Sequence, residues 1–214
     1  VHRSMPAGIQ PPGLSLRAWR GVITNPVLMA MVGVTALAGA GQFTVFSYFA
    51  PYFRDVMQAS PAQLALVFGW FGLFGLAGNL TLSRQVDRIG AHRAVAWLLA
   101  LILVSLALWP LARSVGAMLL VLVPWGLGCM ASNSAQQARL GHVAPLLAPA
   151  LMALNTSAIY FGQAVGAAGG GWLVSHDGYA QLHWVALLLV GAALALSLWA
   201  ARACARGTAL PAPH

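Results

Sequence analysis

Six long apolar runs dominate this sequence, and none of them contains an acidic residue. A helix needs about 20 mostly apolar residues to cross the hydrocarbon core of a bilayer, and the runs are close to that length. They therefore predict an all-α membrane protein with six transmembrane helices. The predicted helices cover about 27–50, 63–83, 94–111, 115–138, 147–174 and 182–201.

The composition supports a bilayer protein and argues against a nucleic-acid partner. Only 7% of the residues are charged and 60% are hydrophobic, whereas soluble domains carry about 25% charged residues. The net charge of +8 comes from eleven arginines. These are scattered near the ends of the runs and form no basic stripe of the kind that binds nucleic acid. The expected partner surface is the lipid bilayer.

The arginines also predict the orientation, because cytoplasmic loops are enriched in basic residues. With the leading segment on the cytoplasmic side, both termini are cytoplasmic. The expected domains are a cytoplasmic linker over 1–25, a transmembrane domain over 26–202 and a cytoplasmic tail over 203–214. Cytoplasmic gaps then hold Arg3, Arg17, Arg20, Arg84, Arg88, Arg93, Arg139, Arg202 and Arg206, and outer gaps hold only Arg54 and Arg113.

Uncharged polar side chains recur at helical spacing within three of the runs. Trp125, Cys129, Asn133 and Gln137, for example, are each four residues apart and share one helix face. An unsatisfied amide in hydrocarbon is costly, so such faces should meet other helices or water. Interhelical hydrogen bonding accounts for any one residue, but three stripes favour a shared polar cavity. Its predicted lining residues are Gln42, Tyr48, Asn133, Gln137, Asn155, Tyr160 and Gln163.

Glycines are concentrated in the fifth run. Gly162, Gly166 and Gly170 are spaced four residues apart, a spacing that lets two helix backbones approach closely in lipid. We expect these glycines to form a packing seam along which this helix also slides or bends.

The gap between the second and third runs reads GNLTLSRQVDRIGAHR, from Gly78 to Arg93. We expect Asp87 to pair with Arg84 or Arg88 and to cap the following helix. Gly90 supplies a tight turn, and Arg93 anchors the next helix at the anionic leaflet.

This loop resembles the G-x-x-x-D-R-x-G-x-R signature of major facilitator superfamily transporters. Three further stretches resemble helices 7, 10 and 11 of the drug, sugar and nucleoside efflux branch, which includes arabinose efflux permeases. They are GQFTVFSYFAPYF at 41–53, WGLGCMASNSAQQARL at 125–140 and NTSAIYFGQAVGAAGGGWLV at 155–174. The resemblance covers roughly 25–202, and the order and spacing of the motifs are its most specific feature.

The resemblance implies that the six helices are helices 7 to 12, one six-helix half of the twelve-helix major facilitator fold. It further implies a proton-coupled efflux transporter, or antiporter, for small organic molecules in the bacterial inner membrane, working by alternating access. The N-terminal six-helix half would be a partner that this chain lacks, and it would carry the acidic coupling residue. The loop residues Gly78, Arg84, Asp87, Arg88, Gly90 and Arg93 would then form a cytoplasmic gate or hinge.

Two other classes of function are open to such a chain. It could be a truncated, non-transporting six-helix membrane module. It could also be an intramembrane enzyme, but no Ser–His or paired-Asp set lies within the apolar runs. We therefore expect no enzyme activity, no catalytic residues, no cofactor and no metal.

Overall fold

The structure, a computed structural model, describes residues 16–206, and every regular element within them is a helix. Six helical segments are long and apolar enough to cross a membrane. The prediction of an all-α fold with six spanning helices is therefore confirmed. The start of the predicted linker, 1–15, and most of the predicted tail, 207–214, lie outside the described residues.

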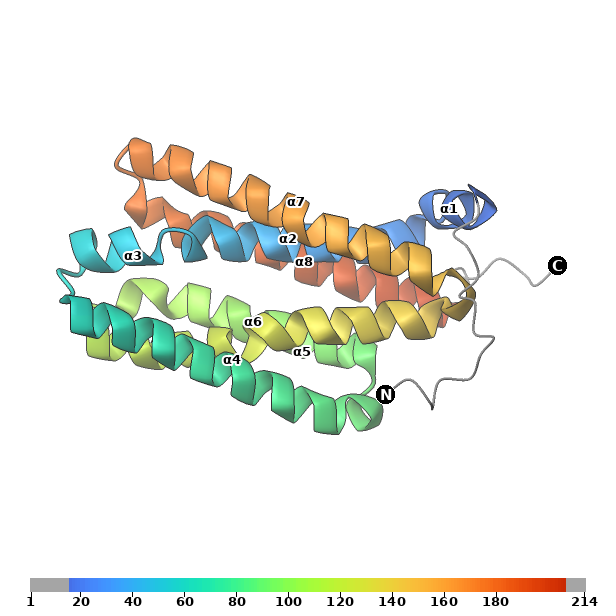
Figure 1. The fold of residues 1–214 in the computed structure, drawn as a ribbon, viewed down its shortest axis with the longest axis horizontal. Helices are drawn as coiled ribbons and strands as arrows, with labels where there is room; N and C mark the ends of the chain where they lie inside the picture. The colour runs from blue at the N-terminus through green and yellow to red at the C-terminus, as the bar shows by residue number, and fades with distance from the viewer. Residues whose placement is uncertain (1–15, 207–214) are drawn as a thin grey trace, which may run out of the picture.

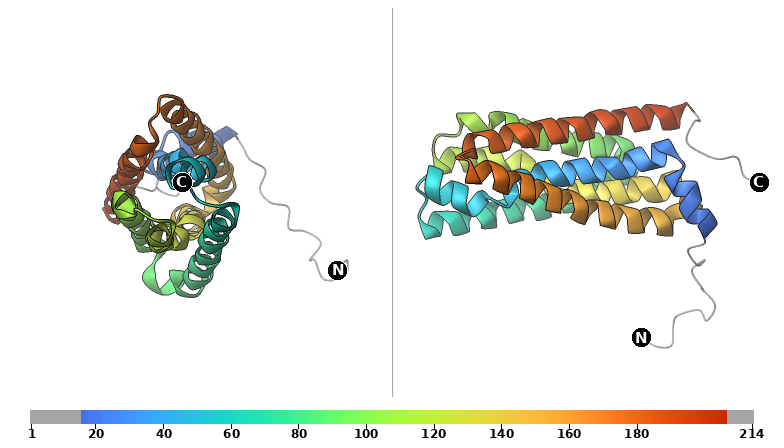
Figure 2. Two further views of the ribbon diagram at one scale, coloured as in Figure 1. Left: turned by 90° about the vertical axis from the view of Figure 1, so that its left-hand side faces the viewer. Right: turned by 90° about the horizontal axis from the view of Figure 1, so that it is seen from above.

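The long helices run side by side along the molecule (Figures 1 and 2). In chain order the helices are α1 (Leu16–Ile23), α2 (Pro26–Phe46), α3 (Phe49–Pro51), α4 (Pro61–Ile89), α5 (Ala91–Leu108), α6 (Val115–Val143), α7 (Ala148–Ser175) and α8 (Leu182–Ala205). Short turns join them: the π-helical η1 (Tyr52–Val56) and the 3₁₀ turns η2 (Trp109–Leu111), η3 (Pro145–Leu147) and η4 (Tyr179–Gln181).

Two helices, α2 and α6, occupy central positions in the bundle. α2 packs against α7 and α8, and α6 packs against α4 and α5, while α5 and α8 also pack against each other. The first three spans (α2, α4 and α5) and the last three (α6, α7 and α8) therefore have equivalent packing. The first helix of each set contacts the second and third helices of the other set. α5 and α8 meet on one side of the bundle, and α4 and α7 flank the other side (Figure 1).

Three helices, α4, α6 and α8, continue past the predicted run ends, because local capping and not hydropathy decides where a helix stops. α4 begins at a capping box in which Ser60 and Gln63 bond each other's backbone N–H groups. It runs to Ile89 and ends at Gly90, whose φ of 84° is readily available only to glycine. α6 likewise runs to Val143, past the predicted end at 138.

α2 stops earlier than predicted, at Phe46, with a break at Ser47 and Tyr48 before α3. Pro51 has no N–H to donate to the carbonyl of Ser47, so the helix cannot continue regularly through this point. The Tyr48 hydroxyl donates to the Ala167 carbonyl of α7 at 2.8 Å and fixes the break against its neighbour.

A short helix, α1, lies within the predicted linker. It leads into α2, whose N-terminus is capped by the Asn25 side chain accepting from the Val27 and Leu28 N–H groups. α1 lies at the same end of the bundle as the C-terminal end of α8 (Figures 1 and 2). We call this the α1 end and the opposite one the α3 end.

Close backbone contact joins α7 to α2. A Cβ added to any of three α7 glycines would overlap a carbonyl oxygen of α2, so no other residue fits there without a shift of the helices. The pairs are Gly162 with Ala36, Gly166 with Ala40 and Gly170 with Thr44.

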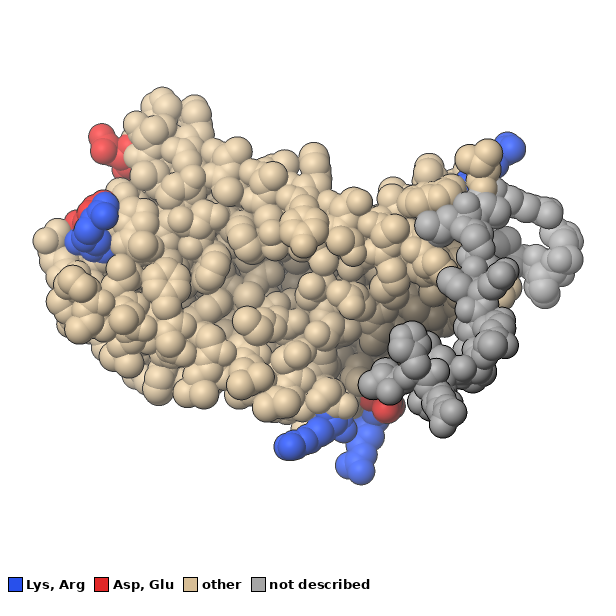
Figure 3. Space-filling view, viewed as in Figure 1, with Lys and Arg blue, Asp and Glu red and all other residues tan. Residues whose placement is uncertain are grey.

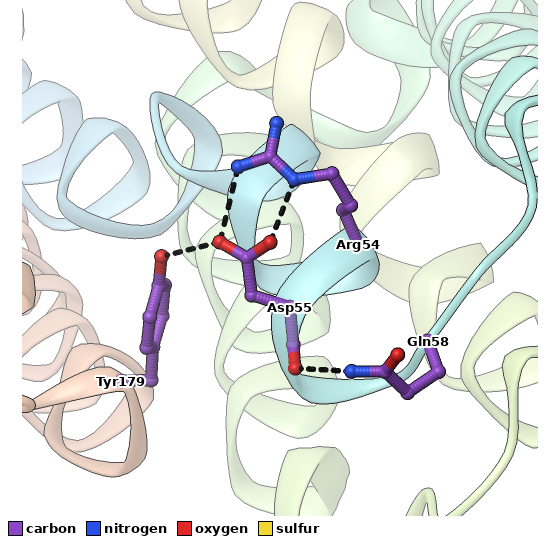
Figure 4. A network of polar contacts seen from close by, with 4 residues as sticks. All are labelled: Arg54, Asp55, Gln58 and Tyr179. Carbon is purple, nitrogen blue, oxygen red and sulfur yellow. Dashed lines mark hydrogen bonds and ion pairs between the residues drawn. The ribbon is translucent and has the colours of Figure 1, made fainter.

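At the α3 end, a polar network ties the segment after α3 to the turn before α8 (Figure 4). Arg54 donates to the two carboxylate oxygens of Asp55 at 2.6 and 3.1 Å. The Tyr179 hydroxyl donates to the same carboxylate at 3.3 Å, and Gln58 donates to the Asp55 carbonyl at 2.8 Å. The network lies at the surface and links segments 124 residues apart in sequence.

Charged side chains lie at the periphery of the face drawn in Figure 3, whose centre is uncharged. One arginine departs from this pattern. The sequence predicts that Arg139 lies in a cytoplasmic gap, but the structure places it inside α6 with 0% of its surface exposed. It donates to the Ser197 hydroxyl and carbonyl of α8, at 2.8 and 3.2 Å. Its Nε has no hydrogen-bond partner among the described residues. The predicted run ended at 138 only because this arginine follows.

Candidate functional site: an uncharged cavity between α2, α4, α6 and α7

A cavity of about 410 Å³ lies within the bundle, lined mainly by α2 and α6, with three residues of α4 and two each of α5 and α7. Pockets that hold small organic molecules range from about 300 to 1,000 Å³. None of its lining residues is charged. Figures 1 and 3 view the bundle from the side that α4 and α7 flank.

The part of the cavity nearer the α3 end is aromatic. Phe46 of α2 lies 5.5 Å from Phe71 of α4 and 5.6 Å from Phe43, measured between ring centroids. Phe68 contacts Phe46, and Trp125 of α6 lies edge-on to Phe71 at 5.6 Å. We call Phe43, Phe46, Phe68, Phe71 and Trp125 the aromatic wall. Such tilted and edge-to-face ring pairs are the favoured aromatic geometries.

The part nearer the α1 end carries hydroxyl and amide side chains, contributed by Thr35, Ser132, Asn133, Gln136 and Gln163. The Gln136 amide nitrogen donates to the Met31 carbonyl, so the Gln136 Oε1 oxygen points away from Met31. The Gln136 Oε1 and Asn133 Oδ1 oxygens are buried and have no donor among the described residues. A buried acceptor left without a donor costs about 1–3 kcal/mol, so these oxygens are sites where a ligand donor would be favoured.

Gln42 joins the two parts of the cavity. Its Oε1 accepts from the Trp125 indole N–H at 3.0 Å, and its amide donates to the Ala38 carbonyl at 3.2 Å. Trp125 is fully buried. The predicted cavity residue Gln42 therefore lines the cavity, and its hydrogen bonds hold Trp125 in place.

Of the seven predicted cavity residues, Gln42, Asn133 and Gln163 line this cavity, and four lie elsewhere. Gln137 is exposed, because one residue along a helix turns the side chain by about 100° and brings Gln136 inward instead. Tyr160 is 67% exposed. Asn155 is buried and accepts from the Thr35 hydroxyl at 2.6 Å, and Tyr48 bonds α7 as described above.

The aromatic wall is the main feature that sequence reasoning missed. Phe43 and Phe46 are three residues apart on α2, and Phe68 and Phe71 are three apart on α4. This spacing places each pair on one helix face. The spacing of polar residues could not reveal these phenylalanines, because apolar residues of a membrane run are of the same types whether they face lipid or protein.

The loop between α4 and α5 differs from its prediction in two respects. Asp87 makes no hydrogen bond or ion pair with Arg84 or Arg88 within the described chain, and all three side chains are exposed. Gly90, not Asp87, occupies the N-cap position of α5, with no side-chain cap. Arg93 is exposed in the first turn of α5.

Gly78, which the motif placed with this loop, lies inside α4. A Cβ there would overlap the Leu127 carbonyl of α6. It therefore packs α4 on α6 in the way that the α7 glycines pack α7 on α2.

Substitution of Gly90 by alanine should destabilise the protein by about 1–2 kcal/mol, because a residue with a Cβ is strained at positive φ. Nothing lies within 4 Å of the added methyl group, so the cost is one of backbone strain alone. Gly116→Ala, at a helical position with equally open space, is the matched control. Thermal unfolding in detergent measures both, and equal midpoints for the two variants would contradict the strain.

Comparison with known proteins agrees with this architecture. The sequence pattern described as Major Facilitator Superfamily matches residues 31–209. The chain is 27% identical over 182 residues to the inner membrane transport protein YdhP of Escherichia coli K12, covering 85% of this chain and 47% of that protein. It is 25% identical over 169 residues to a probable sugar efflux transporter of Pasteurella multocida, covering 78% and 42%.

A third relative is the uncharacterized MFS-type transporter YbcL of Bacillus subtilis, 28% identical over 159 residues, covering 74% of this chain and 41% of the relative. The chain thus spans about half the length of the curated relatives that it matches. Six apolar spans, their paired packing around two central helices and the match over 31–209 show that this chain belongs to the major facilitator superfamily.

Proposed function

We propose that this chain is the C-terminal six-helix half of a proton-coupled efflux transporter for small organic molecules in the bacterial inner membrane. The single observation that carries the proposal is the uncharged cavity of about 410 Å³ between α2, α4, α6 and α7. Substrate sites of such transporters lie near the bilayer midplane between two repeats that rock against each other. The relatives reported above are named as transport proteins, in agreement with the prediction that this chain is not an enzyme.

In this proposal the α1 end faces the cytoplasm. The exposed arginines at the junction of α4 and α5 then lie on the side that basic residues prefer. They would act with Gly90 as a gate or hinge. The second six-helix half would close the cavity on the side flanked by α4 and α7.

The close α2–α7 contact would let the two helices move as one unit during alternating access. In this proposal, proton coupling uses a carboxylate within the membrane. The three aspartates of this chain, Asp55, Asp87 and Asp177, are exposed near helix ends. We therefore assign the coupling carboxylate to the other half.

Efflux from cells expressing the full-length gene tests the proposal, with a panel of drugs, sugars and nucleosides as substrates. Asn133→Leu and Gln163→Leu should each raise the half-saturating substrate concentration about 2- to 10-fold, the effect of one lost hydrogen bond. Gln85→Leu, an exposed amide at the end of α4, is the matched control. A protonophore should stop export.

Two results would overturn the proposal. One is export by the two cavity variants that equals export by the unmodified protein. The other is a full-length product that is made and inserted but exports none of the panel.

A further inference from the structure

The cavity is divided into two chemically different ends, and this division points to a class of ligand. The aromatic wall lies nearer the α3 end, on the second half of α2 and the first half of α4. The amide and hydroxyl groups lie nearer the α1 end, where Thr35 and Gln136 face the cavity. A ligand must satisfy both ends at once.

The amide end requires hydrogen-bond donors. Gln136 is 3% exposed, and its Oε1 has no donor among the described residues. Asn133 is three residues earlier and therefore on the same face of α6, and its Oδ1 also has no donor among the described residues. Both residues line the cavity. Two cavity-lining amides whose oxygens lack a donor favour a ligand with hydroxyl or N–H groups at that end.

The aromatic end requires an apolar ring. Its side chains offer no hydrogen-bonding atom to the cavity, because the one polar atom of the wall, the Trp125 indole nitrogen, already donates to Gln42. A hydroxyl placed against Phe46 or Phe71 would lose its water and gain no partner. A flat ring would instead stack on these side chains or meet them edge-on.

Charge on the ligand is disfavoured by the same lining. No acidic or basic residue lines the cavity, so a charged group would be desolvated without a partner from this chain.

We infer that this half of the site binds a neutral part of the substrate that has a flat apolar ring at one end and hydroxyl or N–H donors at the other, in preference to sugars. This inference rests on the proposed transport function and narrows its substrate. Sugars carry hydroxyl groups all round the ring, and the aromatic wall would leave part of these unpaired. The preference differs from what the name of the Pasteurella relative states for that protein.

A cysteine introduced at position 130 gives a direct readout of occupancy, because Met130 lines the cavity and is 51% exposed, whereas Cys204 lies at the end of α8 away from it. The full-length Met130→Cys protein is placed in lipid nanodiscs, with Cys129 and the cysteines outside this chain replaced by serine. A small maleimide then labels the introduced thiol and Cys204, and Cys204 serves as the internal control. The three probes are 2-(2-naphthyl)ethanol, its methyl ether and glucose.

The alcohol should protect the introduced thiol at about 3- to 10-fold lower concentration than the ether, because only the alcohol donates a hydrogen bond. Glucose should not protect. Asn133→Leu should remove the difference between alcohol and ether while leaving protection by the ether. Phe46→Ala should weaken protection by both, and Gln85→Leu should change nothing.

Equal protection by alcohol and ether, protection by glucose at the same concentration as the alcohol, or an unchanged preference in Asn133→Leu would each overturn the inference. So would labelling of the introduced thiol that none of the probes slows. These outcomes are independent of export. Loss of the binding preference with intact efflux rejects the ligand class alone, whereas absent efflux with an intact preference rejects the proposed function alone.

Discussion

Gly166→Ala should lower the free energy of unfolding by about 1–3 kcal/mol, the cost of forcing an extra carbon into a close-packed contact. The added Cβ would overlap the Ala40 carbonyl of α2, and a backbone atom cannot rotate away as a side chain can. α2 and α7 would have to separate along their length. Denaturation of the protein from mild detergent into SDS, followed by circular dichroism, measures the change.

The control for this substitution is three residues away on the same helix. Gly169 is exposed, with nothing within 4 Å of an added Cβ. Gly169→Ala should be neutral or stabilising by up to about 1 kcal/mol, because alanine has the higher helix propensity. If both variants unfold at the same SDS fraction as the unmodified protein, close contact between α2 and α7 is not what holds this side of the bundle together.

The buried arginine of α6 gives the second large effect. Arg139→Ala should cost about 2–5 kcal/mol, because it leaves a void where a long side chain filled the space between α6 and α8. Arg139→Met, which keeps most of the volume, should cost much less, since a well-packed apolar side chain can replace a buried charge at little cost. The same SDS titration measures both variants.

A second substitution separates packing from hydrogen bonding at this contact. Ser197→Ala removes the hydroxyl that accepts from Arg139 and should cost about 1.5–3 kcal/mol, as for a hydrogen bond to a charged group. In the Arg139→Met background, Ser197→Ala should cost little, so the two effects should not add.

Arg88→Met, at an exposed arginine at the end of α4, should lie within about 0.5 kcal/mol of the unmodified protein. Additive effects of Arg139→Met and Ser197→Ala would show that the contact contributes nothing as a pair.

Arg139, at the end of a predicted run, illustrates one limit of sequence reasoning. An arginine normally ends an apolar run, so the sequence predicts that Arg139 lies in a loop. Inside the bundle it is enclosed by helices that come from distant parts of the chain, and the hydroxyl that it bonds is 58 residues away. No local pattern in α6 carries that information.

The cavity illustrates another limit. The helical spacing found the polar face of α6 but selected Gln137 instead of its neighbour Gln136, because residue spacing defines a face only to about one residue. The phenylalanines of α2 and α4 could not be distinguished from lipid-facing residues by their type. Their positions were decided by the crossing of four helices around one space.

The sequence by itself determined the six spans, the arginine bias and the glycine spacing of the fifth span, and the resemblance of its motifs indicated the family. Each of these features depends on one segment at a time. A span needs an apolar length that matches the bilayer, a cytoplasmic loop is enriched in basic residues, and a close helix contact needs a residue without a side chain. Only the tertiary structure decided which faces turn inward, which amide oxygens remain without a donor and where a buried arginine finds its partner. Those depend on pairings between distant helices, which hydropathy along the chain does not encode.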